Sequence, residues 1–120
     1  MANQQQLGEQ GEMLAANYLE QKGYRILARN WNCRYGEIDL VAQDGETLVF
    51  VEVKTRHAST TEKAFASITP TKQERLAATA QLYLSQELND DTDWRMDVIA
   101  IALPRKGKPI IEHVEDALGW

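Results

Sequence analysis

Apolar and small residues recur at helical spacing near the start of the chain. They fall on one stripe with a period of about 3.6 residues, made up of Gly11, Leu14, Ala15, Tyr18 and Leu19. Gly23 follows Lys22 and suits the left-handed conformation that often ends a helix. The spacing therefore predicts a helix that ends near Lys22, and we expect the polar residues 1–6 before it to be a frayed terminus.

Five segments have the β-branched and aromatic content that favours strands. They are residues 24–31, 37–42, 47–55, 95–103 and 109–114. The first is the weakest, because Ala28-Arg29-Asn30 interrupts its apolar pattern. Asp44-Gly45 stands between the second and third segments and is typical of a two-residue hairpin turn.

A second helix is predicted from Pro70, which suits a first turn, to the region of residues 89–91. Thr71 and Glu74 have the spacing of a capping box. Its core-facing positions are Leu76, Ala80, Tyr83 and Leu84. Residues 57–68, between the third strand and this helix, are polar and small and predict a mobile loop.

These elements occur in the order αβββαββ, without an internal repeat or a linker. The chain has 120 residues, which is a common size for one domain. We therefore expect residues 1–120 to form a single α/β domain, with a mixed sheet and a helix on each side.

The hairpin turn predicts which residues lie opposite one another on the second and third strands. A loop at Asp44-Gly45 places Asp39 opposite Phe50 and Glu37 opposite Glu52. Because paired residues share a face, one face carries Glu37, Asp39, Phe50, Glu52 and Lys54. The other face is apolar and consists of Ile38, Leu40, Ala42, Val49, Val51 and Val53. A slip of one residue would bury Asp39 among these apolar side chains, which supports the predicted register.

The acidic face is electrostatically costly. Two carboxylates about 6 Å apart repel by about 3 kcal/mol at an effective dielectric near 20, and Lys54 can neutralise only one of them. A divalent cation such as Mg²⁺ or Mn²⁺, which prefers oxygen ligands, would relieve this repulsion. Glu12 borders the apolar stripe of the first helix and could face the same site. The alternatives are a solvated acidic face paired with nearby arginines, and a Glu12 that stabilises its own helix N-terminus.

Charge is unevenly distributed along the chain, whose net charge is −5. Residues 25–35 contain three arginines and no acid, and residues 54–75 contain five basic residues against two acidic ones. One interpretation is a basic surface on an acidic body, and the other is scattered solvated charges. The single cysteine, Cys33, excludes an internal disulfide, and no apolar run is long enough to cross a membrane. With no signal-peptide pattern, we expect a cytoplasmic protein.

The sequence from Gly36 to Lys54 resembles the D-x(n)-E-x-K signature of the PD-(D/E)xK nuclease superfamily, carried by Asp39, Glu52 and Lys54. A wider set of motifs, from residue 8 to about 116, resembles the YraN family of bacterial proteins. These motifs are Gly8-x-x-Gly11-Glu12, Ala16-x-Tyr18-Leu19, Gly23-Tyr24-x-Ile26-Leu27-x-Arg29-Asn30, Val49-Phe50-Val51-Glu52-Val53-Lys54-Thr55-Arg56, Lys72-x-x-Arg75-Leu76 and Arg95-Met96-Asp97-Val98-Ile99. That family is similar in its core to archaeal Holliday-junction resolvases.

The resemblance implies a restriction-endonuclease-like fold and hydrolysis of phosphodiester bonds in structured or branched DNA. Asp39, Glu52 and Glu12 would hold Mg²⁺ or Mn²⁺, and Lys54 would position or activate the attacking water. Ile38 stands where some relatives have proline. Glu37 has no fixed role in the superfamily, so a role beside the site and a structural role both stay open.

Contacts to nucleic acid are expected from four basic residues: Arg34, Arg56, Lys72 and Arg75. Lys72 and Arg75 lie three residues apart and share a helix face, where they could hold a phosphate backbone or remain solvated. Trp31 and Tyr35 could stack on an unpaired base, although a core position is more common for a tryptophan. Symmetric cutting of a junction would require a two-fold homodimer.

Two further interpretations remain. The first is a non-catalytic nucleic-acid-binding domain with a nuclease-like fold, which the acidic net charge mildly favours. The second is an assembly factor that docks through the acidic stretch at residues 87–97. Within that stretch Asp97 lies on a predicted strand between Arg95 and Ile99, and we expect it to form a buried salt bridge rather than a catalytic site.

Overall fold

In the computed structural model, which describes residues 3–87 and 92–117, five strands form one sheet in their order along the chain. The elements are α1 (Gln4–Gln21), β1 (Arg25–Cys33), β2 (Gly36–Asp44), β3 (Thr47–Arg56), α2 (Glu62–Ala66), α3 (Pro70–Glu87), β4 (Trp94–Ala102) and β5 (Ile110–Val114). β3 and β4 are parallel, and the other neighbouring strands are antiparallel. The predicted mixed sheet is confirmed, and α2 is an additional short helix. None of the helices in the described residues is long and apolar enough to span a lipid bilayer.

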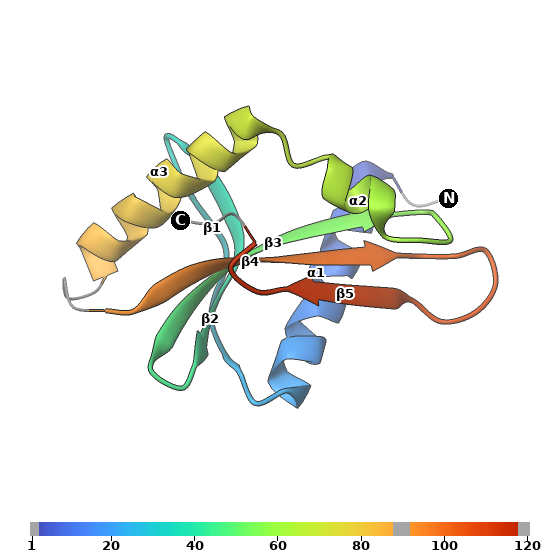
Figure 1. Cartoon of the computed structure of the whole chain (residues 1–120), viewed down its shortest axis with the longest axis horizontal. Coiled ribbons are helices and arrows are strands. Elements are labelled where there is room, and N and C mark those ends of the chain that lie inside the picture. The colour runs from blue at the N-terminus through green and yellow to red at the C-terminus, as the bar shows by residue number, and fades with distance from the viewer. Residues whose placement is uncertain (1–2, 88–91, 118–120) are drawn as a thin grey trace.

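Each face of the sheet packs against a helix, as predicted (Figure 1). On one face, Ala15, Ala16 and Leu19 of α1 pack on Leu40, Val51 and Ile99 of the sheet, together with further buried residues. On the other face, Leu76, Ala80 and Tyr83 of α3 pack on Val41, Phe50 and Met96. Because both faces are covered, the central strands are apolar on both sides, which is typical of sheets in α/β proteins.

Three segments differ locally from the expectation. Residues 3–6 are ordered as a helix start, because the side chain of Asn3 accepts a hydrogen bond from the Gln6 amide and caps α1. Residues 62–66, within the expected loop, form α2 and bury Ala64. α3 is capped by Thr69, whose hydroxyl accepts from the Lys72 amide, rather than by Thr71. The expected end of this helix at residues 89–91 and part of the acidic stretch lie outside the described residues.

The register predicted for the β2–β3 hairpin is wrong. Asp44 pairs with Thr47 and Val41 pairs with Phe50, so Asp39 is not opposite Phe50. The reason is the turn, in which Gly45 takes the first central position with φ of +62° and leaves Asp44 in the strand. In the observed register, the partner of each residue is shifted by two positions. Because side chains alternate between the two faces of a strand, a shift of two leaves the paired side chains on the faces that were predicted. The exception is Ile38, which packs on the α3 side rather than with Leu40.

A buried ionic network fastens β5 to β4. Asp97 is fully buried and binds Arg95 at 3.0 Å and His113 of β5 at 2.7 Å. It also accepts a hydrogen bond from the Asp116 amide at 3.0 Å. Burial alone would raise the Asp97 pKa, but these bonds outweigh it and hold the pKa below its usual value. The predicted salt bridge is therefore confirmed.

Replacement of Gly11 by alanine should destabilise the protein, because α1 lies in close contact with Thr55 of β3 there. A Cβ at Gly11 would lie 2.9 Å from Cβ of Thr55 and closer still to its Oγ1. We expect a loss of about 1–3 kcal/mol in the free energy of unfolding, measured with urea. Gly8→Ala is the matched control, since nothing lies within 4 Å of that added Cβ. Equal effects of the two changes would contradict the close packing.

Asp97→Asn should lower the free energy of unfolding by about 3 kcal/mol at pH 7, because Arg95 loses its buried counter-charge and His113 loses its contact with a carboxylate. The pKa of Asp97 is lowered in the folded state, so its contribution is present at neutral pH and is lost as pH falls through that pKa. Urea unfolding at pH 7 and under strongly acidic conditions measures this difference. The exposed Glu115, 3.8 Å from Arg95, provides the control Glu115→Gln, which should change stability little.

Candidate metal centre

The site begins where β2 separates from β3. Main-chain pairing of the two strands extends as far as Leu40 and Val51. Immediately beyond it, the amide of Val53 donates a hydrogen bond of 2.8 Å to Oδ2 of Asp39. The carboxylate thus takes the position of a main-chain acceptor, and the Asp39 side chain is fixed at the opening between the strands.

Glu52 and Lys54 project from β3 beside this opening. Nζ of Lys54 lies 2.9 Å from Oε1 of Glu52, and both side chains are largely buried. Burial alone would lower the pKa of Lys54, but the Glu52 carboxylate outweighs it and raises that pKa. Lys54 is therefore a cation at neutral pH, held in place by Glu52.

Three carboxylates converge on the other side of the opening. Glu12 of α1 and Glu37 and Asp39 of β2 each offer an oxygen atom, and these atoms lie within 4.8 Å of one another. Glu12 and Asp39 belong to the predicted ligand set, and Glu37 is a residue whose role the sequence left open. Glu52, the third predicted ligand, is outside this group of three but adds its charge to both Asp39 and Glu12.

Asn30 is a component of the site that the sequence analysis did not assign. It has a left-handed φ of 51° within β1, which is uncommon for a residue other than glycine. Its side chain is hydrogen-bonded to Glu12, which favours the ionised form of that acid. The available signal was the weak strand character of Ala28-Arg29-Asn30, since local departures from strand propensity often mark functional positions.

Two acids of the site, Asp39 and Glu12, have raised pKa values and hold their protons more tightly than usual. Burial, followed by the charge of Glu52, raises the pKa of Asp39 to about 8, although the Val53 amide opposes the shift. Burial also raises the pKa of Glu12, and Glu37 adds to the effect. The carboxylates therefore lack sufficient positive charge among their protein neighbours, and a divalent cation fits this set of oxygen donors.

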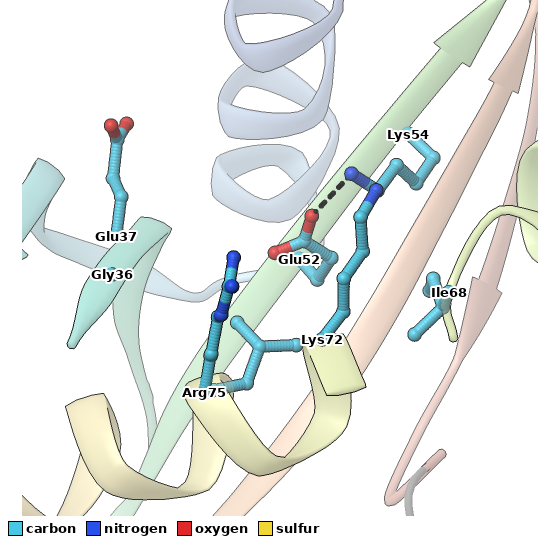
Figure 2. A pocket seen from close by; sticks show the side chains of 8 residues that line it. Gly36, Glu37, Glu52, Lys54, Ile68, Lys72 and Arg75 are labelled. Carbon is cyan, nitrogen blue, oxygen red and sulfur yellow. Dashed lines mark ion pairs between the residues drawn. The ribbon is translucent and has the colours of Figure 1, made fainter. Parts of the chain in front are cut away.

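A cavity of about 190 Å³ lies next to these carboxylates and is lined by Gly36, Glu37, Glu52, Lys54, Ile68, Lys72, Arg75 and Leu76. Figure 2 shows Lys72 and Arg75 extending from α3 toward Glu52 and Lys54 on β3, with Glu37 farther off. The charge of Lys54, followed by burial, lowers the pKa of Lys72. Mutual repulsion of two ammonium groups in one cavity favours an anion between them.

The remaining predicted residues lie apart from this cavity lining. Arg56 lines a different cavity near the start of α1 and donates to the carbonyl of Thr55. Arg34 is exposed in the turn before Gly36, where its guanidinium covers the ring of Tyr35. Trp31 is partly buried and packs edge-on against Tyr83 at the border of the core.

Comparison with known proteins places the chain in a family. A profile described as "Uncharacterised protein family UPF0102" matches residues 11–101. The chain belongs to the UPF0102 family. A UPF0102 protein of Chloroflexus aurantiacus is 53% identical over 116 residues, which cover 94% of this chain and 92% of that protein. UPF0102 proteins of Geotalea uraniireducens and Mycolicibacterium vanbaalenii are 43% and 41% identical, covering 97% and 92% of this chain and 91% of each relative.

Membership of UPF0102 agrees with the resemblance to YraN proteins. The profile begins at Gly11 and ends at Ile101, so it includes Glu12, Asp39, Glu52 and Lys54. The family description states no activity. The chemistry of the site must therefore be argued from its own geometry.

Asp39→Asn should stabilise the metal-free protein at pH 8. The pKa of Asp39 rises from an ordinary 3.8 to about 8 on folding, so the folded state binds more protons between these values. The wild-type protein therefore loses stability as pH rises from 4 to 8, and the amide, which does not titrate, avoids that loss. We expect a gain of at least about 1 kcal/mol at pH 8, the equivalent of one pKa unit, and little gain at pH 4.

Thermal unfolding in EDTA at pH 4 and pH 8 measures the gain in stability of Asp39→Asn. A second measurement in the presence of Mn²⁺ tests metal binding. Mn²⁺ should raise the unfolding temperature of the wild-type protein more at pH 8 than at pH 6, because Asp39 must lose its proton to bind. The same addition should have little effect on Asp39→Asn. If Asp39→Asn were less stable than the wild-type protein at pH 8 in EDTA, the expectation would be wrong. The ionised Asp39 carboxylate would then be stabilised by its protein neighbours without a metal.

Proposed function

We propose that this chain is a metal-dependent endonuclease that hydrolyses phosphodiester bonds in structured or branched DNA. The observation that carries the proposal is the meeting of a carboxylate cluster with a cationic cavity. Glu37 belongs to both, since it lies within the group of Glu12 and Asp39 and also lines the cavity with Lys72 and Arg75. Metal-dependent phosphodiester hydrolysis uses both halves, one to hold the cation and one to hold the anionic substrate.

Glu12, Asp39 and Glu52 would hold Mg²⁺ or Mn²⁺, and the position of Glu37 supports its addition to this set. A bound ion of this kind supplies a lower pKa for the attacking water and positive charge beside the phosphate. Asp39, anchored by the Val53 amide, fixes one ligand direction. Asn30 orients Glu12 through its hydrogen bond.

Lys54 acts by charge rather than as a base, because its raised pKa keeps it protonated at neutral pH. Its contact with Glu52 at 2.9 Å directs the ammonium toward the carboxylates, where it can orient a water molecule or a phosphate oxygen. Lys72 and Arg75 reach the same cavity from α3 and would hold the phosphate backbone. Arg34 and Arg56, which lie outside this cavity lining, would extend contact to flanking nucleotides.

The choice of branched DNA depends on the resemblance to junction resolvases, and a two-fold homodimer would be needed for symmetric cutting of a junction. The test therefore compares DNA substrates that differ in structure. Labelled duplex, single-stranded, flap and four-way-junction DNA are incubated with the protein in Mg²⁺, Mn²⁺ or EDTA.

Asp39→Asn, Glu52→Gln and Glu12→Gln should each reduce metal-dependent cleavage, by at least about 100-fold for the first two. Glu20→Gln is the matched control for Glu12, because Glu20 is exposed on α1 two turns farther along the helix. It should cleave at the wild-type rate. Cleavage that persists in all three site variants would contradict the site assignment, and salt-sensitive DNA binding without cleavage would support the non-catalytic binding domain instead.

A further inference from the structure

The turn between β1 and β2 stands directly beside the candidate centre. Arg34 and Tyr35 are its two residues, between the paired Cys33 and Gly36. Gly36 itself lines the cavity that holds Lys72 and Arg75. Tyr35 is therefore the residue next to Gly36, which lines this cavity.

Contacts with α3 hold this turn in one position. A Cβ at Gly36 would lie 3.4 Å from Oγ1 of Thr79 and 3.8 Å from Cβ of Arg75, and Sγ of Cys33 is 3.9 Å from the same Thr79 oxygen. Inside the turn, the Tyr35 amide donates to Sγ of Cys33 at 3.4 Å. Gly36 has φ of +153°, a conformation that side chains rarely adopt. The turn is therefore packed on α3 through both of its ends.

Tyr35 is exposed at the end of this supported turn. It is 40% exposed, whereas Trp31 on the same strand pair is packed against Tyr83. The guanidinium of Arg34 lies 4.9 Å from the centroid of the Tyr35 ring and donates to its hydroxyl at 2.9 Å. A cation on one face reduces the freedom of the ring, so an aromatic surface is presented to solvent in a defined orientation.

We infer that Tyr35, held by Arg34, is a stacking site for an unpaired nucleobase next to the phosphate bound by Lys72 and Arg75. This inference rests on the proposed function and specifies its substrate class as DNA with an unpaired nucleotide beside the bound phosphate. An aromatic ring accepts any base, because every base has a π face. A base inside a duplex is stacked on its neighbours and is not available to the ring, whereas a bulged or single-stranded base is.

The test measures DNA binding in EDTA, so that it does not depend on cleavage. Two labelled duplexes are compared, one fully paired and one with a single bulged 2-aminopurine. Tyr35→Ala and Tyr35→Leu should weaken binding of the bulged duplex about fivefold to 150-fold, the equivalent of ~1–3 kcal/mol for one stacked base. Tyr35→Phe, which keeps the ring, should bind as wild type does. None of the variants should change binding of the paired duplex or the unfolding temperature.

Quenching of 2-aminopurine fluorescence by the wild-type protein, and its loss in Tyr35→Leu, gives a direct sign of stacking. The inference is overturned if Tyr35→Leu matches wild type on the bulged duplex, or if all variants lose affinity equally for both duplexes. Either result leaves the nuclease proposal intact, provided that the wild-type protein binds and cleaves DNA. A retained stacking signal in a protein that never cleaves would instead overturn the nuclease proposal alone.

Discussion

Where β2 leaves β3, the Val53 amide donates to the carboxylate of Asp39 rather than to a main-chain carbonyl. Without this acceptor, the opening would leave a buried amide unpaired at a cost of about 1–3 kcal/mol. The carboxylate that satisfies the amide is also buried and close to Glu52 and Glu12, so that burial first and then these charges raise its pKa. One hydrogen bond thus permits the sheet to open and concentrates negative charge at the opening.

The positive charges of the site lie beside these carboxylates and do not neutralise each of them by pairing. Acids from α1 and β2 form one cluster, and Lys54, Lys72 and Arg75 line the adjoining cavity, with Glu37 belonging to both. Of these cations, Lys54 is paired with Glu52, and Lys72 is repelled by Lys54. A chain with net charge −5 therefore contains a local surface suited to an anion, which its overall charge does not suggest.

The elements and their faces could be predicted because helix and strand periods are local properties of the sequence. The register of the β2–β3 hairpin could not be predicted. Two turns that start one residue apart were possible, and the backbone conformation of Gly45 decided between them. The spacing of Lys72 and Arg75 predicted a shared helix face, and the two residues line one cavity. The convergence of Glu37 with Glu12, and the contact of Asn30, depend on how α1, β1 and β2 are placed in space, which spacing along the chain does not determine.

The parallel pairing of β3 with β4 also orders the assembly of the protein. Two-residue turns join β1, β2 and β3, whereas β4 reaches β3 only after the chain has passed through α2 and α3. Closing the longer loop costs more chain entropy, so the three-stranded meander forms on shorter-range contacts. During synthesis, the acidic half of the site is complete while Lys72 and Arg75 are still to be added. The nascent chain thus acquires the carboxylates of the candidate metal centre before it acquires the basic residues of the adjoining cavity.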